Sequence, residues 1–390
     1  MNKMIIQFGT PCIDHEEIEA ITDVIKSGWI GFGKKCLEFE SKFSEFTGAK
    51  YAKSLNSCTS ALHVSLKILG IKEGDEVITT PLTFAATIRA IEMVGAKPIL
   101  VDINAYTFNI NPTKLNTAIT NKTKVIIPVH FGGMPCDIGS IFKIAKERNL
   151  YVIEDAAHAL GAEFDQNKIG SFEESMACFS FYPNKNITTI EGGMITTSNE
   201  DYANKIGTIR MMGQSSGAWQ RYAKTRKYFI PEVTAEGYKY NMTDINAAIG
   251  IVQLSKLEKF IQTRERHAAI YDGVLKNFNH INIQKRTIDG HHVRHALHLY
   301  AIVLKEGSFK CDREYIINQI RERGIGVAVH YRPIHEHSYF KNKYSFDLSR
   351  LKNSTYIGKN IISLPLGPAF KDEDISFAAN VILEVLKENT

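Results

Sequence analysis

The stretch from Tyr151 to Gly193 constrains the fold of this chain more than any other. It opens with an apolar run that ends in two acids and small residues, Tyr-Val-Ile-Glu-Asp-Ala-Ala-His (151–158). Such a run predicts a buried strand of a parallel sheet that delivers a carboxylate at its C-terminal end, where open α/β sheets gather their ligands. A second predicted strand, 177–182, is followed by a lone lysine, Lys185, between a proline and a glycine pair.

Asp155 and Lys185 make a chemically meaningful pair if an aldehyde cofactor lies between them. A lysine amine holds pyridoxal phosphate as a Schiff base, while an aspartate keeps the pyridinium nitrogen protonated so that the ring accepts electrons. Ser180 is then placed for the phosphate. The same residues also have structural interpretations, because an acid that ends a strand often caps a helix and an isolated lysine is usually a solvated surface charge.

Composition narrows the class of protein. The 390 residues, 44% of them hydrophobic, are enough for a sizeable core and two domains. The net charge of +5 comes from 47 basic and 42 acidic residues that are mixed along the chain, which gives no sign of a dedicated nucleic-acid surface. Six scattered cysteines without a Cys-x-x-Cys pair, no signal peptide and no apolar run of about 18 residues predict a soluble cytoplasmic protein.

Short apolar runs alternate with helical segments over the first two thirds of the chain. Runs at 76–81, 97–102 and 124–130 precede those already described. This alternation predicts an α/β fold with a central, mostly parallel sheet covered by helices on both faces. From about residue 275 the pattern changes to strand-like runs and two helices, which indicates a smaller α+β domain. We therefore divide the chain into a large domain, 1–250, and a small C-terminal domain, 251–390.

The N-terminal region contains one helix signal and one weak nucleotide-binding signal. Ile18, Ile21 and Ile25 recur at helical spacing, and Gly28 follows as a C-cap, so an amphipathic helix is predicted over 15–27. The glycine and lysine spacing of residues 28–34 matches a P-loop. However, Lys35 stands where the magnesium-binding Ser or Thr belongs, and a helix precedes the motif instead of a strand.

Two further stretches suit an anionic, planar ligand. Residues 56–66 begin with small polar residues and continue as a helix, and a helix N-terminus exposes unpaired N–H groups that bind phosphate, although a plain N-cap is the alternative. Phe84 lies just beyond a strand end, where an aromatic ring either stacks on a cofactor or belongs to the core. A basic cluster at 221–227 is either a solvated loop or a receptor for a substrate phosphate or carboxylate.

A histidine-rich tract near residue 295 does not predict a metal site. It contains His291, His292, His295 and His298, but no Cys or acid completes a ligand set, and a strand would point these side chains both ways. The segment 329–335, Val-His-Tyr-Arg-Pro-Ile-His, is a better candidate for lining a pocket.

Taken together, these stretches resemble the DegT-type sugar aminotransferases, a family of fold type I pyridoxal-phosphate enzymes. The resemblance covers nearly the whole chain, and its motifs occur in one order. They are 9–11, 27–29, 56–66, 81–87, 154–161, 180–193, 237–250, 298–300, 329–335 and 363–366.

The resemblance implies a role for individual residues. Lys185 would form the Schiff base, Asp155 would pair with the pyridinium, Phe84 would stack on the ring and His158 would lie near the 3-oxygen. The phosphate would be held by Cys58 backbone, Thr59 and Ser180, with a contribution from the 237–241 segment of a second subunit, so a homodimer with shared active sites is implied. The expected substrate-binding residues are Trp29, His330, Tyr331 and His335.

Two positions depart from the family pattern. Many relatives read Gly-Tyr-Asn-Tyr-Arg where this chain has Gly-Tyr-Lys-Tyr-Asn (237–241), which leaves open whether Lys239 or Asn241 reaches the phosphate. Many relatives also have a histidine where this chain has Tyr182. The lysine itself is kept, which opposes the dehydratase branch of the family, where a histidine replaces it.

The expected reaction is a ping-pong transamination in which the resemblance suggests L-glutamate as donor and a keto sugar as acceptor. The variant 237–241 and 329–335 segments look most like the branch that acts on lipopolysaccharide sugars. Its acceptors include nucleotide-linked 4-keto sugars, slightly favoured here, and 8-oxo-3-deoxy-octulosonate. The alternative is a non-catalytic regulator that binds the cofactor or a sugar without turnover.

Overall fold

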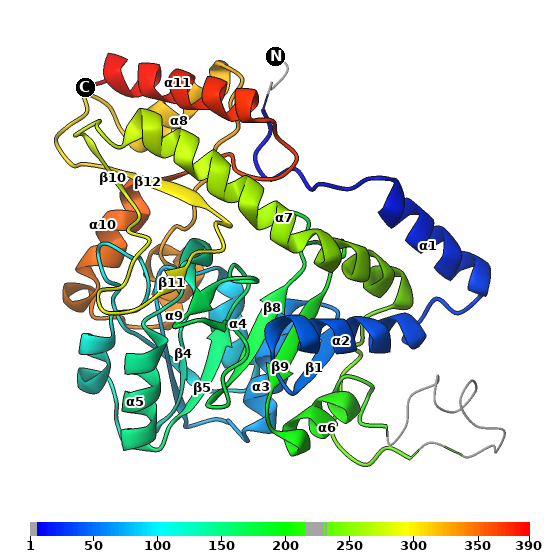
Figure 1. Cartoon of the computed structure of the whole chain (residues 1–390). Helices are drawn as coiled ribbons and strands as arrows, with labels where there is room; N and C mark the ends of the chain where they lie inside the picture. The colour runs from blue at the N-terminus through cyan, green and yellow to red at the C-terminus, as the bar shows by residue number, and fades with distance from the viewer. Residues whose placement is uncertain (1–5, 215–229, 231) are drawn as a thin grey trace.

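The computed structural model describes residues 6–214, 230 and 232–390 (Figure 1). The basic cluster predicted at 221–227 lies outside the described residues. The largest sheet has seven strands in the order β1-β9-β8-β5-β4-β2-β3. Their bounds are β1 Tyr51–Leu55, β2 Glu76–Thr79, β3 Lys97–Leu100, β4 Thr123–Ile127, β5 Tyr151–Asp155, β8 Ser175–Ser180 and β9 Gly193–Thr197.

The sheet is mostly parallel, as predicted. β5 pairs in parallel with β4 and β8, and β2 pairs in parallel with β3 and β4. β9 is the exception, since it runs antiparallel to both of its neighbours, β8 and β1. The carboxyl ends of β5 and β8 therefore lie at the same edge of the sheet, which brings Asp155 and the segment after Ser180 together.

Helices cover both faces of this sheet because alternate strand residues point to opposite sides. On one face, Val77, Ile153 and Cys178 pack with residues of α3 (Cys58–Ile68), α4 (Ala85–Met93) and α6 (Glu200–Ile209). On the other face, Ile78 and Val152 pack with residues of α2 (Lys34–Thr47), α5 (Ile138–Arg148) and α7 (Asp244–Leu275). The near-continuous apolar strands recognised in the sequence are thus buried on both sides.

The C-terminal part has its own core around a second sheet, β10-β12-β13 (Ile281–Ile283, Tyr300–Leu304, Ile361–Leu364). Its helices are α8 (Arg313–Glu322), α9 (Ser338–Lys343), α10 (Lys352–Asn360) and α11 (Asp372–Glu388). A third small sheet joins β11 (Val293–Arg294) to β6 (Glu163–Phe164) and β7 (Asn167–Lys168). Short 3₁₀ helices are η1 Pro112–Thr117, η2 Phe131–Gly133, η4 Ile334–Glu336 and η5 Leu348–Arg350.

Helix α7 connects the two cores as one 32-residue helix (Figure 1). Residues up to Ile261 pack into the core of the large sheet, and residues from Ala268 onward pack into the C-terminal core. The domain boundary that the sequence analysis places at residue 250 falls inside α7. The N-terminus also contributes to the second core, because Ile6 pairs with Ile325.

Helix α1 (His15–Ser27) forms where the isoleucine spacing predicts it, and Gly28 caps it in the left-handed region with a φ of 74°. The helix does not use the predicted face, however. Glu17 and Val24 are buried, whereas Ile18 and Ile25 are 62% and 57% exposed. The buried Glu17 is paired with groups on α7, which turns the isoleucines outward.

Candidate active site

Asp155 and Lys185 line the same cavity, as the sequence analysis expected. The cavity has a volume of about 440 Å³, which lies in the range of small-molecule and cofactor sites. Nine of the predicted site residues line it: Cys58, Thr59, Phe84, Asp155, His158, Ser180, Lys185, His330 and Tyr331. Four others do not, namely Trp29, Lys239, Asn241 and His335.

Asp155 ends β5 as a buried carboxylate held by two donors. The Thr87 hydroxyl donates to Asp155 Oδ2 at 2.8 Å, and the backbone N–H of Ala157 donates to Oδ1 at 3.2 Å. Burial still raises the pKa of Asp155, against these hydrogen bonds and the nearby Lys185, which lower it. A buried carboxylate that keeps a raised pKa is suited to a cationic N–H partner, because such a partner would favour its charged form.

Lys185 lies in the loop that follows β8, and its backbone N–H donates to the Tyr182 backbone carbonyl at 2.9 Å. Desolvation lowers the pKa of its amine to about 8, against the nearby Cys58 and Asp155, which raise it. A lysine with this pKa holds a useful fraction of neutral amine near neutral pH, and the neutral form is the nucleophile.

The start of α3 provides a seat for an anion. Ser57 is the N-cap and accepts from the backbone N–H of Ser60 at 3.1 Å, while the N–H groups of Cys58 and Thr59 lie in the first turn, where a helix offers no internal acceptor. A Cβ on Gly193 would come within 2.6 Å of Ser57 and Cys58 backbone atoms, so glycine lets β9 pass close to this turn. Burial raises the pKa of the Cys58 thiol well above its ordinary value, which leaves backbone rather than thiolate as the phosphate contact.

His158 and Tyr331 form a hydrogen-bonded pair on the cavity wall. The Gly132 N–H donates to His158 Nδ1 at 3.2 Å, and His158 Nε2 lies 3.0 Å from the Tyr331 hydroxyl. Burial lowers the pKa of His158 well below its ordinary value, so the ring is neutral and its proton is on Nε2. His158 therefore donates to Tyr331, which leaves the tyrosine O–H to donate to another group.

Phe84 caps α4 at the cavity and is 62% exposed, so it is a wall residue and not part of the core. Its exposed position on the cavity wall fits the predicted stacking role. With the phosphate seat, the carboxylate and the amine, the residues present fit pyridoxal phosphate.

The predicted residues outside the cavity have other contacts in this subunit. The Lys239 ammonium donates to Asn241 Oδ1 at 2.6 Å, and Asn241 Nδ2 donates to the Met242 carbonyl. Trp29 Nε1 donates to the Phe32 carbonyl. His335 Nε2 lies 2.8 Å from the Thr355 hydroxyl and lines a neighbouring cavity.

The P-loop-like segment binds a carboxylate of the chain itself. The backbone N–H groups of Gly33, Lys35 and Cys36 donate to Asp244 at 2.8, 3.1 and 3.0 Å. The donors that would hold a nucleotide phosphate are therefore occupied, and the structure gives the ATP-binding alternative no support.

The histidine tract is dispersed among different contacts. His291 pairs with Asp165, while His298 is buried with its ring centroid 4.3 Å from that of His158. Within residues 6–214, 230 and 232–390, no three His, Cys, Asp or Glu side chains gather in a metal-binding arrangement. Over the same ranges, no helix has the length and apolar content needed to cross a membrane.

Sequence reasoning missed the residues that hold the site residues in place without lining the cavity themselves. Thr87 holds Asp155, Gly132 holds His158, and two amides of α7, Asn246 and Gln253, bind the loop that carries Lys185. Each contact joins residues far apart in the chain, so no local pattern points to it.

Comparisons with known proteins agree with this geometry. The profile of the DegT/DnrJ/EryC1/StrS aminotransferase family matches residues 11–383. The spore coat polysaccharide biosynthesis protein SpsC of Bacillus subtilis is 39% identical over 383 residues, which are 98% of this chain and 97% of that protein.

Solved structures are similar over the same extent. The sugar aminotransferase Spr1654 from Streptococcus pneumoniae, described as putative and solved in a PMP form, superposes with a TM-score of 0.91 at 32% identity, covering 98% of this chain and 99% of that one. It has also been solved in a PLP form. PseC of Helicobacter pylori, an aminotransferase of pseudoaminic acid biosynthesis, has a TM-score of 0.89 at 29% identity, with coverage of 98% and 99%.

Proposed function

The chain belongs to the DegT/DnrJ/EryC1/StrS aminotransferase family, and on that premise we propose that it transfers an amino group from L-glutamate to a keto sugar of a surface polysaccharide. It is a pyridoxal-phosphate-dependent sugar aminotransferase; the donor, acceptor and pathway are the proposal. The favoured acceptor is a nucleotide-linked 4-keto sugar, and 8-oxo-3-deoxy-octulosonate is the second candidate. Similarity to proteins of spore coat polysaccharide and pseudoaminic acid biosynthesis supports a surface sugar. Family membership favours the enzyme over the non-catalytic alternative.

One observation carries this proposal: a lysine whose pKa is lowered to about 8 shares a cavity with a buried aspartate and a helix N-terminus. When bound, pyridoxal phosphate supplies an aldehyde that takes up amino groups and a ring that accepts electrons. Asp155 would hold the ring nitrogen, the first turn of α3 and Ser180 the phosphate, and Phe84 one face of the ring.

Three residues of the site would have distinct roles in the reaction. The Lys185 amine would hold the cofactor and would move a proton at the substrate Cα. Thr87 favours the ionised form of Asp155 by donating to it, against the effect of burial. Tyr331, which accepts from His158, has its own proton free to donate toward an oxygen in the cavity.

We further propose a cytoplasmic homodimer with shared active sites. All six cysteines are free, which suits a reducing compartment. Phe84 and Ile190 are more than half exposed beside the cavity, and Ile18 and Ile25 expose apolar surface on α1. A partner would cover such surface, and its Lys239 or Asn241 would complete the phosphate site. Mixing Lys185→Ala subunits with Lys239→Ala/Asn241→Ala subunits tests sharing, because only shared sites restore activity in the mixed dimer.

The proposed donor and acceptor are tested by absorbance. Purified protein with pyridoxal phosphate should absorb in the visible, and L-glutamate should convert this absorbance to that of the pyridoxamine form. Adding candidate keto sugars one at a time to the glutamate-treated protein then identifies the acceptor, because only a substrate restores the visible absorbance. A protein that takes up no pyridoxal phosphate overturns the roles of Lys185 and Asp155, and one that ignores glutamate overturns the donor.

A further inference from the structure

The loop that carries Lys185 has no regular secondary structure, so its shape depends on contacts from outside. Residues 181–192 are closed at their base, where the backbone N–H of Thr189 donates to the Phe181 carbonyl and the N–H of Phe181 donates to the Gly192 carbonyl. These bonds fix the two ends of the loop. The peptide groups a few residues after Lys185 need further partners if the amine is to keep one position.

Helix α7 supplies those partners from a single face. Gln253 Oε1 accepts from the backbone N–H of Thr188 at 3.3 Å, and Asn246 Nδ2 donates to the Thr189 carbonyl at 2.5 Å. The two amides are seven residues apart, about two helical turns, so they point the same way. They bind consecutive residues of the loop, three and four positions after Lys185.

A glycine between the two amides lets the loop approach the helix. A Cβ on Gly250 would lie 2.9 Å from Thr189 Cγ2 and 2.7 Å from Phe39 Cζ, both closer than packed carbon atoms come. Glycine inside a helix costs roughly 1 kcal/mol relative to alanine. Its presence at this position therefore fits a requirement for close contact with the lysine loop.

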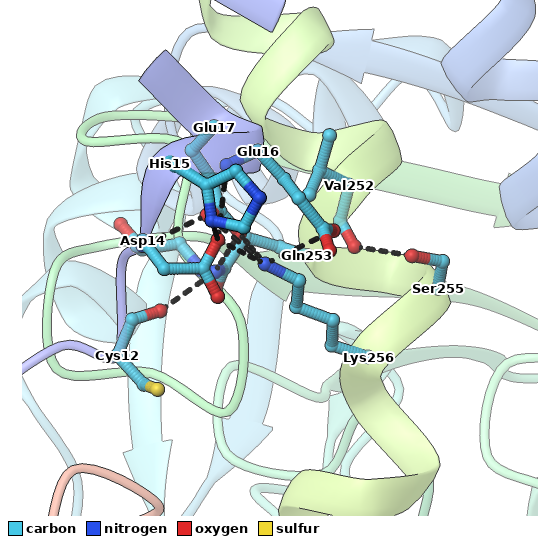
Figure 2. Close-up of polar contacts among 10 residues, drawn as sticks. Cys12, Asp14, His15, Glu16, Glu17, Val252, Gln253, Ser255 and Lys256 are labelled. Carbon is cyan, nitrogen blue, oxygen red and sulfur yellow. Dashed lines mark hydrogen bonds and ion pairs between the residues drawn. The ribbon is translucent and has the colours of Figure 1, made fainter. Parts of the chain in front are cut away.

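The other end of Gln253 contacts the N-terminal helix, and Figure 2 shows Gln253 beside Cys12 and Glu17. Gln253 Nε2 donates to Glu17 Oε1 and to the Cys12 carbonyl, each at 2.8 Å. Glu17 is buried and also accepts from the Lys256 ammonium at 2.9 Å and from the Asp14 N–H at 3.0 Å. The amide orientation is fixed by this arrangement, because only the Nε2 end can donate to a carboxylate and a carbonyl, which leaves Oε1 for Thr188.

We propose that Gln253 and Asn246 are positioning residues that hold the lysine loop against α7, so that the Lys185 amine stays in the desolvated wall of the cavity. The inference rests on the proposed role of Lys185 as the cofactor lysine. It goes further by assigning the placement of that lysine to two side chains that do not line the cavity.

The test measures the Lys185 amine directly, in cofactor-free protein. Acylation of Lys185 by a trace of acetic anhydride, followed by mass spectrometry over a range of pH, reports its pKa, which should be about 8 in the wild type. In Gln253→Leu the Thr188 N–H loses its acceptor, the loop loosens and water reaches the amine. The pKa then rises toward its ordinary value, and acylation below that pH slows by roughly tenfold for each unit.

Two further variants make the result specific. Asn246→Ala leaves the Glu17 cluster intact and should slow acylation in the same direction, which keeps the test available if Gln253→Leu does not fold. Lys256→Met disrupts the same cluster without touching the loop, and should acylate like the wild type. Unchanged acylation in folded Gln253→Leu or Asn246→Ala overturns the inference, as does an equal change in Lys256→Met. A wild type that acylates normally but binds no pyridoxal phosphate refutes the proposed function instead, so the two failures are distinguishable.

Discussion

Replacing Thr87 with valine should reduce the stabilisation of the ionised Asp155 carboxylate while leaving the shape of the cavity nearly unchanged. The Thr87 hydroxyl donates at 2.8 Å to Asp155 Oδ2, and the remaining donor, the Ala157 N–H, is longer at 3.2 Å. A hydrogen bond to a charged group contributes about 1.5–3 kcal/mol. Losing it should lower kcat/KM for the amino donor by about ten- to a hundredfold where Asp155 must be ionised.

The pH dependence follows from the sign of this interaction. The Thr87 bond favours the ionised form, so its removal raises the pKa of Asp155 beyond the effect of burial. Asp155 then binds a proton over more of the acidic range, and the loss of kcat/KM should be largest at low pH and should shrink as pH rises.

The assay is kcat/KM for L-glutamate across the pH range in which the protein stays folded. Thr83→Val is the matched control, because Thr83 contacts the Thr87 hydroxyl at 2.8 Å but does not touch Asp155. The control should lose much less activity than Thr87→Val. A loss in Thr87→Val that is equal at every pH, or no larger than in the control, refutes the reasoning.

Three other predictions follow from the site and its surroundings. Lys185→Ala should lose both the visible absorbance of bound cofactor and turnover, because Lys185 is the one lysine among the described residues that line the cavity; a variant that keeps both contradicts the assignment. Uptake of pyridoxal phosphate by cofactor-free wild type, followed by stopped-flow absorbance, should accelerate as pH rises through about 8, since the neutral amine is the reactive form; a rate independent of pH argues against a desolvated lysine. Asp244→Ala should lower the free energy of unfolding by about 2–3 kcal/mol in urea denaturation, because three backbone N–H groups lose a carboxylate; Asp201→Ala, in the first turn of α6, is the control and should change much less.

The sequence was most informative where function depends on strand ends. Asp155 and Ser180 are the last residues of β5 and β8. The apolar run before Asp155 predicted the end of the first strand, whereas the predicted second strand, 177–182, ends two residues later than β8 does. Parallel strands place those ends at one edge of the sheet, so the sequence alone predicts that these two residues, 25 positions apart, lie close together. Lys185, five residues further, follows from the same reasoning.

The sequence was least informative where packing depends on a distant polar partner. The spacing of Ile18 and Ile25 predicts that they face the core, yet Glu17 is the buried residue of that turn. Its partner, Lys256, is 239 residues away and neutralises the carboxylate that periodicity would assign to solvent.

The beginnings of α2 and α3 show why a spacing motif does not by itself identify a phosphate site. Both helices expose backbone N–H groups in their first turn, and the glycine-rich segment before α2 is the closer match to a phosphate-binding motif. Asp244, more than 200 residues later, binds three of those groups at α2. No acidic side chain of the described chain reaches the equivalent groups of Cys58 and Thr59, which line the cavity with Lys185. Whether a helix start binds an external anion therefore depends on whether an acidic side chain of the same fold already binds its N–H groups. That depends on tertiary structure.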